Sequence, residues 1–363
     1  MNIAFVSRYL PSNSKAGVGY QAHRLAETLT KRGHRVTVFS QGPRPDASYG
    51  FVSLRTPGSN HLAEPAAFAL AVASVDFAPY DVVHYHGDNQ YVNADTPSVR
   101  TFYGTAVWEA RFSDNQAYSL LQASNYAMEF LSGMRSDINV AISESTRHAL
   151  PFVDMVIPVG VDVSLFTPGA KSKTPSILFV GTLKGRKRGS LLLQTFLREV
   201  LPSHPSARLM MVGVEYVGQH GVTAIRRASD QQLAELYRLA WIYCSCSSYE
   251  GFGVPYLEAM ASGTPCVSTP NAGAKEVLPG VGAIVHERDL GKVLCSLIND
   301  DKKRFDMAAA GLARVREYRF ENIAARYEAA YERARRGGNG RRAARIRFSD
   351  MVETMYGVIC QGR

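Results

Sequence analysis

The sequence predicts an α/β protein with two domains, each built on a doubly wound parallel sheet. The chain has 363 residues, more than one hydrophobic core usually organises, so two domains are expected. Short apolar strand patterns alternate with helical patterns, which is typical of parallel strands joined by helices. After a polar joint from Gly169 to Pro175 the same pattern starts again. This repetition predicts a second domain with the element order of the first.

In the N-terminal half, Asn2 to Ser7 is a buried strand pattern, and apolar residues from Ala22 to Leu29 then repeat at helical spacing until Lys31 to Gly33 end the helix. Four further strands are expected, at Val36 to Phe39, Asp81 to Tyr85, Val99 to Tyr103 and Asp137 to Ile142. We therefore expect residues 1–165 to form the N-terminal, acceptor-side domain.

Turn residues between Ile157 and Pro168 predict a crossing into the second domain, which we expect to span 170–318. Its predicted strands are Ile177 to Gly181 and Arg208 to Val212, and its predicted helices are Ser190 to Val200 and Asp230 to Leu239. Residues 319–363 are expected to form C-terminal helices and a basic tail that packs back on the N-terminal domain.

The net charge of +9 is concentrated at the end of the chain. From Arg333 onward the sequence has eight arginines and two acidic residues, a charge of +6. The preceding 332 residues therefore carry only about +3, which is an ordinary net charge. The stretch Arg335 to Arg342 predicts a basic joint, and apolar residues from Phe348 to Ile359 then follow at helical spacing. This helix could dock on the protein itself or lie on an anionic membrane surface. Nucleic acid is not expected as a partner, because no aromatic-interleaved basic motif accompanies the charge.

The N-terminus passes directly into a strand pattern and lacks an export signal, and no apolar run is long enough to span a membrane. We expect a cytoplasmic protein, in peripheral contact with the inner membrane face if the tail binds lipid. The five cysteines lack the paired spacing of a zinc site and are interpreted as reduced, mostly core residues. Cys244 and Cys246 alternate on a predicted strand, so their thiols should share one face.

Residues 250–266, EGFGVPYLEAMASGTPC, are the most informative segment. Pro255 suits the first turn of a helix, so the amides of Phe252, Gly253 and Val254 should lie at the helix N-terminus. Such amides, together with the helix dipole, form an anion site. Glu250 would lie beside the phosphate end and Glu258 one turn into the helix, where carboxylates can accept hydrogen bonds from sugar hydroxyls. A plain helix start with surface acids is the alternative interpretation.

The segment resembles the Glu-x7-Glu motif of retaining glycosyltransferase family four, whose members have the GT-B arrangement of two Rossmann-like domains facing across a cleft. Ten residues match in step, namely Glu250, Gly251, Phe252, Gly253, Glu258, Ala259, Met260, Gly263, Thr264 and Pro265. The resemblance implies that Glu250 contacts the transferred sugar and that Glu258 contacts the ribose. It also implies that Gly17 and Gly19 form a loop that reaches the donor diphosphate; a purely structural turn is the alternative.

Four cations lie in the segment Gly181 to Gly189, between a predicted strand and helix. The family usually has an Arg directly after the first Gly of this loop and a Lys seven residues after that Gly; Thr182 and Arg188 occupy these positions. Arg188 can hold phosphate oxygens in bidentate geometry, whereas Thr182 cannot replace an arginine. Lys184, Arg186 or Lys187 must then supply the second charge. We name Arg188 and Lys184 with Glu250 as catalytic candidates, and Gly181 and Lys187 as donor-binding ones.

Family members commonly place a histidine in a T-x-H-G turn near the acceptor, where this chain has Thr101-Phe102-Tyr103-Gly104. Tyrosine is a poor general base near neutral pH. Tyr103 and His86 are therefore candidates for acceptor contact. Structural imidazoles bonded to the backbone are the alternative for His84 and His86.

The resemblance implies retaining transfer of a hexose-type sugar from a nucleotide sugar to a hydroxyl of a glycan, a glycolipid or a small molecule. A uridine donor is expected on frequency alone, and no metal or other cofactor is expected, because loop cations and helix amides would neutralise the diphosphate. Two alternatives stay open: a nucleotide-sugar epimerase of the same architecture, and a non-catalytic sugar-nucleotide-binding protein.

Overall fold

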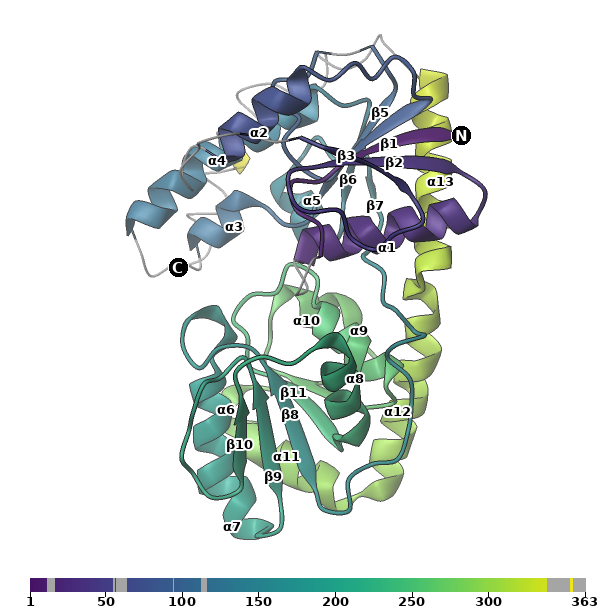
Figure 1. The fold of residues 1–363 in the computed structure, drawn as a ribbon. Coiled ribbons are helices and arrows are strands. Elements are labelled where there is room, and N and C mark those ends of the chain that lie inside the picture. The colour runs from purple at the N-terminus through teal and green to yellow at the C-terminus, as the bar shows by residue number, and fades with distance from the viewer. Residues whose placement is uncertain are drawn as a thin grey trace. The chain divides into compact units, whose positions relative to one another are not determined.

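The structure is a computed structural model that describes residues 1–11, 17–54, 56, 64–93, 95–111, 116–337 and 353–354. The chain divides into two compact units (Figure 1). The N-terminal unit comprises Met1–Gly160 together with the chain from Phe320 onward, and the C-terminal unit comprises Val161–Arg319. The C-terminal helix thus belongs to the first unit.

The N-terminal unit is built on a seven-stranded sheet in which every neighbouring pair is parallel. Its strands are β1 (Asn2–Val6), β2 (Arg35–Ser40), β3 (Gly50–Ser53), β4 (Val82–Tyr85), β5 (Ser98–Phe102), β6 (Ile138–Ala141) and β7 (Met155–Val156). They are ordered β3-β2-β1-β4-β5-β6-β7. The order reverses between β1 and β4, and ligands of open α/β sheets bind beyond the carboxyl ends of the strands at such a point.

Helices cover both faces of this sheet (Figure 1). They are α1 (Gly17–Lys31), α2 (Glu64–Ala73), α3 (Ala106–Arg111), α4 (Gln116–Met134), α5 (Glu144–Ala149) and α13 (Phe320–Gly337). Alternation along β1 separates two cores. Ile3 and Phe5 pack in a cluster with residues of α1 and α13, whereas Ala4 and Val6 pack in another with residues of α2. Both faces of the sheet are therefore buried.

The C-terminal unit repeats this architecture on a six-stranded parallel sheet. Its strands are β8 (Ser176–Val180), β9 (Arg208–Val212), β10 (Val222–Ile225), β11 (Ile242–Ser245), β12 (Cys266–Ser268) and β13 (Ala283–Ile284). The order β10-β9-β8-β11-β12-β13 reverses between β8 and β11. The segments after these two strands carry the cationic loop and Glu250. Topology therefore brings the two sequence motifs of this unit together.

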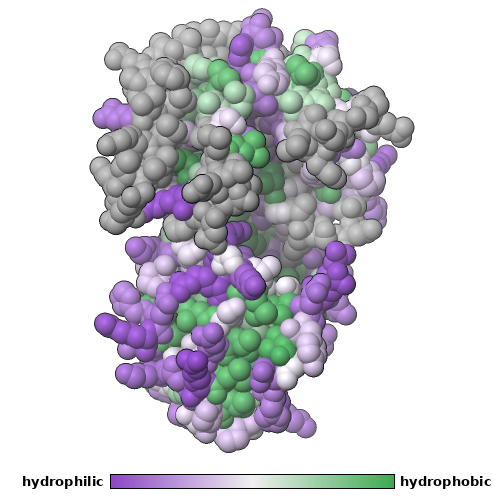
Figure 2. Space-filling view, turned by 90° about the vertical axis from the view of Figure 1, so that its left-hand side faces the viewer, coloured by the Kyte–Doolittle hydropathy of each residue, from purple (hydrophilic) through white to green (hydrophobic). Residues whose placement is uncertain are grey.

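The helical segments of the C-terminal unit surround its sheet. They are η1 (Gly185–Lys187), α6 (Gly189–Thr195), η2 (Phe196–Val200), α7 (Leu201–Ser203), α8 (Asp230–Leu239), α9 (Val254–Ala261), α10 (Ala272–Val277), η3 (Glu287–Asp289), α11 (Leu290–Asn299), α12 (Asp301–Val315) and η4 (Arg316–Tyr318). One core joins α6, η2 and α11 to the sheet. Some of its members, such as Leu193 and Leu197, are only partly buried, and Figure 2 shows hydrophobic residues at the surface of this unit, bordered by hydrophilic ones.

Cys244 and Cys246 are both fully buried in that core, so the expected shared face is confirmed. Cys244, Cys246, Cys266 and Cys295 are free thiols, and the first three are buried. No helix among the described residues is both long enough and apolar enough to cross a membrane. The predicted amphipathic tail helix lies outside the described residues apart from positions 353 and 354, so its role stays a prediction.

Candidate functional site

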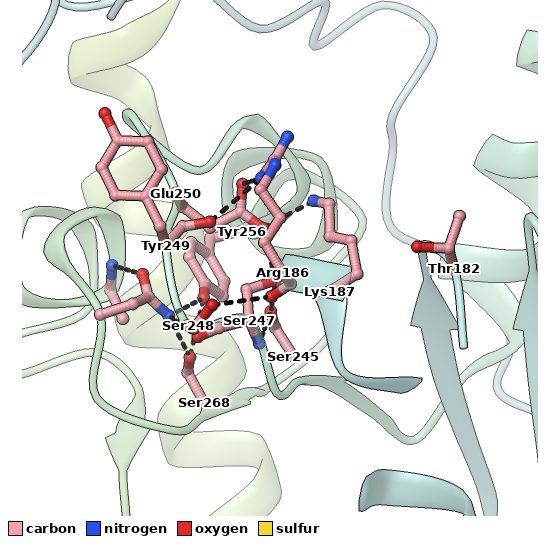
Figure 3. Close-up of polar contacts among 12 residues, drawn as sticks. Thr182, Arg186, Lys187, Ser245, Ser247, Ser248, Tyr249, Glu250, Tyr256 and Ser268 are labelled. Carbon is pink, nitrogen blue, oxygen red and sulfur yellow. Dashed lines mark hydrogen bonds and ion pairs between the residues drawn. The ribbon is translucent and has the colours of Figure 1, made fainter. Parts of the chain in front are cut away.

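Glu250 lies in the loop between β11 and α9, where it is buried with only 7% of its surface exposed. Its Oε1 accepts hydrogen bonds from Lys187 Nζ at 2.6 Å and Ser247 Oγ at 2.7 Å. Its Oε2 accepts from an Arg186 guanidinium nitrogen at 3.3 Å. Figure 3 shows these side chains converging, with Thr182 lying apart from them. Two loop cations thus meet the first glutamate of the motif.

Glu250 remains ionised despite its burial. Burial alone would raise the pKa of this carboxyl, but the Lys187 ammonium, the hydrogen bonds from Lys187 and Ser247, and the Arg186 charge together lower the pKa below its usual value. The result is a fixed negative charge bonded to two cations. A donor diphosphate at this position would compete with Glu250 for Lys187 and Arg186.

In the structure the loop cations do not share one partner, and the partners that they have are not the ones that the sequence hypothesis suggests. Arg188 has a left-handed backbone (φ 51°), and its guanidinium pairs with Glu287 at 2.5 Å, while Lys187 and Arg186 contact Glu250. Lys184 is exposed, and its carbonyl accepts from Thr182 Oγ1 at 2.8 Å. The phosphate-binding role of Arg188 stays a prediction, and Lys187 is the neighbouring cation that lies against Glu250.

Gly181 follows β8 and starts this loop with φ of 155°. A Cβ there would lie 2.9 Å from both Cβ and Cγ of Lys187. The Lys187 side chain therefore packs directly over Gly181, and a larger residue at position 181 would displace it.

The N-terminus of α9 has the features that its sequence predicts. Gly253 precedes the helix with φ of 98°, and Pro255 lies in the first turn. The amides of Phe252, Gly253 and Val254 have no hydrogen-bond partner within the described part of the chain. They therefore remain available to an anion.

The loop before α9 is held by α10. A Cβ on Gly273 would meet the Phe252 carbonyl oxygen at 2.5 Å, so α10 must approach closely. The Asn271 side-chain amide donates to the Ser247 carbonyl at 3.2 Å and to Tyr256 Oη at 3.1 Å, and its Oδ1 caps α10 through the Ala274 amide at 2.9 Å. Ser247 is thereby positioned to donate to Glu250.

Glu258 lies inside α9 and is 4% exposed. It faces Tyr237, whose pKa is raised well above its usual value by burial and by the Glu258 charge. The second motif carboxylate is therefore more enclosed than the sequence hypothesis of an accessible ribose contact suggested. Ribose contact by Glu258 stays a prediction.

In the N-terminal unit, Gly17 and Gly19 open α1, near the carboxyl end of β1. A Cβ on Gly19 would lie 2.2 Å from the Tyr9 carbonyl oxygen, whereas a Cβ on Gly17 would have no neighbour within 4 Å. Gly19 is required for close packing of α1 on the loop after β1, and Gly17 is not.

Substituting Gly19 with alanine should therefore lower the free energy of unfolding by about 1–3 kcal/mol, the cost of forcing an extra methyl into a packed site. Gly17→Ala is the matched control and should change it by less than about 1 kcal/mol. Thermal and urea unfolding of both variants measure this. Equal effects of the two substitutions would contradict the packing role of Gly19.

Tyr103 and His86 are bonded to each other, with His86 Nδ1 and Tyr103 Oη 2.8 Å apart. Burial raises the pKa of Tyr103 well above its usual value, so its phenol is no base at neutral pH. His84 is fully buried, and its two ring nitrogens lie 2.8 Å from Tyr331 Oη and Thr101 Oγ1. His84 is thus a structural imidazole that ties α13 to β4 and β5.

His86 should make the protein sensitive to acid. Burial, followed by the Arg100 charge, lowers the pKa of His86 to about 3. In the unfolded chain this histidine takes up its proton near pH 6.5, so stability present at pH 7 is lost as the pH falls toward 3, by at most about 1.4 kcal/mol per pH unit.

The thermal midpoint should accordingly fall less steeply between pH 7 and pH 5 in His86→Gln than in the parent protein. His148, which is exposed on α5, supplies the control: His148→Gln should retain the parent slope. A slope in His86→Gln that matches the parent would contradict this origin of the acid sensitivity.

Comparisons with known proteins agree with this geometry. Residues 16–181 match the family model Glycosyltransferase Family 4, and residues 163–314 match Glycosyl transferases group 1. The chain belongs to glycosyltransferase family 4. Its two parallel sheets form the GT-B fold, and the enzyme is a retaining glycosyltransferase.

One relative of this glycosyltransferase covers most of the chain, and another covers less than half of it. The phosphatidyl-myo-inositol mannosyltransferase of Mycobacterium tuberculosis is 27% identical over 368 residues, which cover 86% of this chain and 93% of that protein. The GDP-mannose-dependent monoacylated alpha-(1-6)-phosphatidylinositol monomannoside mannosyltransferase of Corynebacterium glutamicum is 31% identical over 44% of this chain and 50% of that protein. Among solved structures, sucrose-phosphate synthase from Thermosynechococcus elongatus superposes with a TM-score of 0.75 at 19% identity, covering 92% of this chain and 98% of that one, and this likeness shows the fold alone.

Sequence reasoning missed two residues of the candidate site, Ser247 and Asn271. Ser247 precedes Glu250 by three positions in a serine-rich stretch after β11, which is the signal that could have found it. Asn271 is the N-cap of α10, and it also donates a hydrogen bond to the Ser247 carbonyl. This second contact depends on the position of α10 in the fold, which no local sequence pattern predicts.

Proposed function

We propose that this enzyme transfers a mannosyl group, with retention of configuration, from a nucleotide-linked mannose to a hydroxyl group of an acceptor. The observation that carries the proposal is the contact of Glu250 with Lys187 and Arg186, one loop before the open amides of α9. In this arrangement the cations and amides can bind a diphosphate, and the carboxylate can bind a sugar.

The leaving diphosphate would displace Glu250 from Lys187 and Arg186, and the freed carboxylate would then accept hydrogen bonds from sugar hydroxyls. Lys187, Arg186 and the amides at the start of α9 would stabilise the charge that develops as the glycosidic bond breaks, an effect worth several kcal/mol. Holding donor and acceptor in reacting geometry adds a term of similar size.

The proton of the acceptor hydroxyl would pass to the departing phosphate oxygen on the same face of the sugar. This route needs no protein base at the position of Tyr103, whose hydroxyl is bonded to His86. The route is therefore compatible with a tyrosine, Tyr103, at the position where the family usually has a histidine.

The names of the relatives favour mannose as the sugar, and one of them names GDP-mannose as the donor. The sequence-based guess of a uridine donor rests only on frequency, so GDP-mannose is the donor that we place first. The same names favour a glycolipid acceptor, and a membrane contact through the arginine-rich tail would then bring the enzyme to its acceptor.

A nucleotide-sugar panel tests the function. The purified enzyme is incubated with GDP-mannose, UDP-glucose and UDP-galactose, with and without lipid extracts, and release of the nucleoside diphosphate is measured together with the anomeric configuration of the product. Release from GDP-mannose that rises with acceptor, giving an α-linked product, is expected. Conversion of the donor into a new nucleotide sugar would support an epimerase. Tight binding of a nucleotide sugar without transfer or conversion would support a non-catalytic binding protein.

A further inference from the structure

Glu250 is also held by uncharged residues that lie outside the Glu-x7-Glu motif. Ser247 Oγ donates to Glu250 Oε1 at 2.7 Å, and Ser245 Oγ, at the end of β11, donates to Ser247 Oγ at 3.2 Å. Both serines are buried, with no more than 3% of their surface exposed. A hydroxyl group has only one proton to donate, and Ser247 gives its proton to Glu250. The chain of donors therefore ends on the carboxylate.

Helix α10 holds the backbone of Glu250. The Gly273 amide donates to the Glu250 carbonyl at 3.1 Å. A Cβ on Gly273 would lie 2.9 Å from Glu250 Cβ, which is shorter than an ordinary carbon–carbon contact. Only glycine therefore lets α10 approach this closely. The main chain of Glu250 is fixed from α10, and its carboxylate is fixed from β11 through Ser247.

Asn271 joins these two supports. Its side-chain amide donates to the Ser247 carbonyl at 3.2 Å, to Tyr256 Oη at 3.1 Å and to Ser268 Oγ at 3.1 Å. Tyr256 Oη and Ser268 Oγ are themselves 2.7 Å apart (Figure 3). A Cβ on Gly253 would lie 2.4 Å from the Tyr256 ring, so the same network supports the start of α9. Buried polar networks whose members are all bonded are rigid.

The loop cations cannot be fixed supports for Glu250 while sugar is transferred. In the proposed function the donor diphosphate takes Lys187 and Arg186 away from this carboxylate, and the hydrogen bond from Ser247 then remains. The position of Ser247 is set by Asn271 and by β11, which do not depend on the diphosphate. The uncharged network would therefore keep the Glu250 carboxylate in place after the cations have left it.

We propose that Ser247 and Asn271 are positioning residues that hold the Glu250 carboxylate toward the transferred sugar once Lys187 and Arg186 have moved to the diphosphate. This inference rests on the proposed function for the contact between Glu250 and the sugar. It does not depend on which sugar or which base the donor carries. Ser247 and Asn271 act through Glu250 and have no direct role in the reaction.

The kinetics of Ser247→Ala, measured with the donor identified by the panel, test this role. The variant should lower kcat by about tenfold or more, because a hydrogen bond to a charged group is lost, while the KM for donor changes by less than about threefold. Ser176→Ala is the matched control, since it removes a buried hydroxyl at the start of β8 that donates to the Leu239 carbonyl. Its kcat should equal that of the parent. Parent-level kcat in Ser247→Ala would overturn the proposal.

A double-mutant cycle shows whether Ser247 acts through Glu250. Adding Ser247→Ala to Glu250→Gln should lower kcat by less than about twofold further, because the effects of residues in contact do not add. Losses that multiply in the double variant would mean that Ser247 acts independently of Glu250, and they would overturn the proposal. Thermal midpoints of all variants report whether the fold is intact.

Asn271→Ser separates the two roles of this residue. Serine keeps a hydroxyl that can cap α10, but its side chain is too short to reach the Ser247 carbonyl. We expect kcat to fall by about fivefold or more while the thermal midpoint stays near that of the parent and the KM for donor is unchanged. Parent-level kcat in this variant would remove Asn271 from the proposal.

The ionisation of Glu250 gives a measurement that needs no turnover. Burial raises the pKa of this carboxyl, and the Lys187 charge, the hydrogen bonds from Lys187 and Ser247, and the Arg186 charge lower it. Ser247→Ala should therefore raise the pKa of Glu250, whereas Ser176→Ala should not. NMR titration of isotope-labelled glutamate carboxyls, assigned with Glu250→Gln, measures it.

The other titratable groups around Glu250 are the same in every variant of this titration. Burial raises the pKa values of Tyr243 and Tyr256, and the Glu250 charge adds to both effects. Helix α10 carries Lys275, which is exposed, and Glu276, which is half-buried. A change in the Glu250 titration in Ser247→Ala therefore reports the lost hydroxyl.

The titration also separates this inference from the proposed function. If the pKa of Glu250 rises in Ser247→Ala but the parent transfers no mannose, the proposed function fails and the positioning of Glu250 stands. If the parent transfers mannose while Ser247→Ala keeps the parent kcat, the positioning role fails alone. An unchanged pKa of Glu250 in Ser247→Ala overturns the inference for any donor.

Discussion

Replacing Glu250 with glutamine should lower the transfer rate by about 100-fold or more, equivalent to about 2.7 kcal/mol of transition-state stabilisation. The amide keeps the shape of the side chain but loses the charge that Lys187, Arg186 and Ser247 surround. It accepts weaker hydrogen bonds from sugar hydroxyls, and it leaves Lys187 without its counter-ion. The measurement is kcat and KM with the donor identified by the panel, beside the thermal midpoint of the variant.

The control for this variant is Glu215→Gln, which removes an exposed carboxylate of the same unit that pairs with Arg226. Exposed pairs contribute little, so its kinetics should match the parent. Parent-level turnover in Glu250→Gln, with an unchanged fold, would move the sugar site away from the start of α9.

Lys187→Gln should lower kcat by about 100-fold, whereas Arg188→Gln should lower it by less than about fivefold, because removal of one donor to a developing charge typically costs about 2.7–4 kcal/mol. Lys187 lies 2.6 Å from Glu250, while Arg188 is directed to Glu287. From these partners we expect the opposite order to the one that sequence position alone suggests, since Arg188 occupies the family's usual lysine position.

Steady-state rates of the two variants at saturating donor give the comparison. Arg226→Gln, which breaks an exposed pair in the same unit, controls for loss of a surface cation and should leave kcat unchanged. A larger loss in Arg188→Gln than in Lys187→Gln would restore the sequence hypothesis and would require the η1 turn to rearrange when donor binds.

Much of the fold could be predicted from sequence because the main signals are local. The helix at Asp230–Leu239 and the strand at Arg208–Val212 coincide with α8 and β9, since amphipathic spacing and a serine cap identify the helix and a short apolar run identifies the strand. The sequence analysis missed the short edge strands β3 and β7, and it also missed β10, β12 and β13 of the C-terminal unit. Gly50–Ser53 has no clear alternation, and Met155–Val156 is too brief to leave a pattern.

The sequence by itself determined the two α/β units and the helix that begins after Gly253. It also identified the Glu-x7-Glu motif and the cationic loop by which the chain resembles glycosyltransferase family 4. Each of these depends on residues close together in the chain, whose spacing fixes the hydrogen bonding and burial of one element. Only the tertiary structure decided that Lys187 contacts Glu250 while Arg188 pairs with Glu287, and that Asn271 positions Ser247. These pairings join separate strands and loops, and the order of the sheets decides which side chains come within hydrogen-bonding distance.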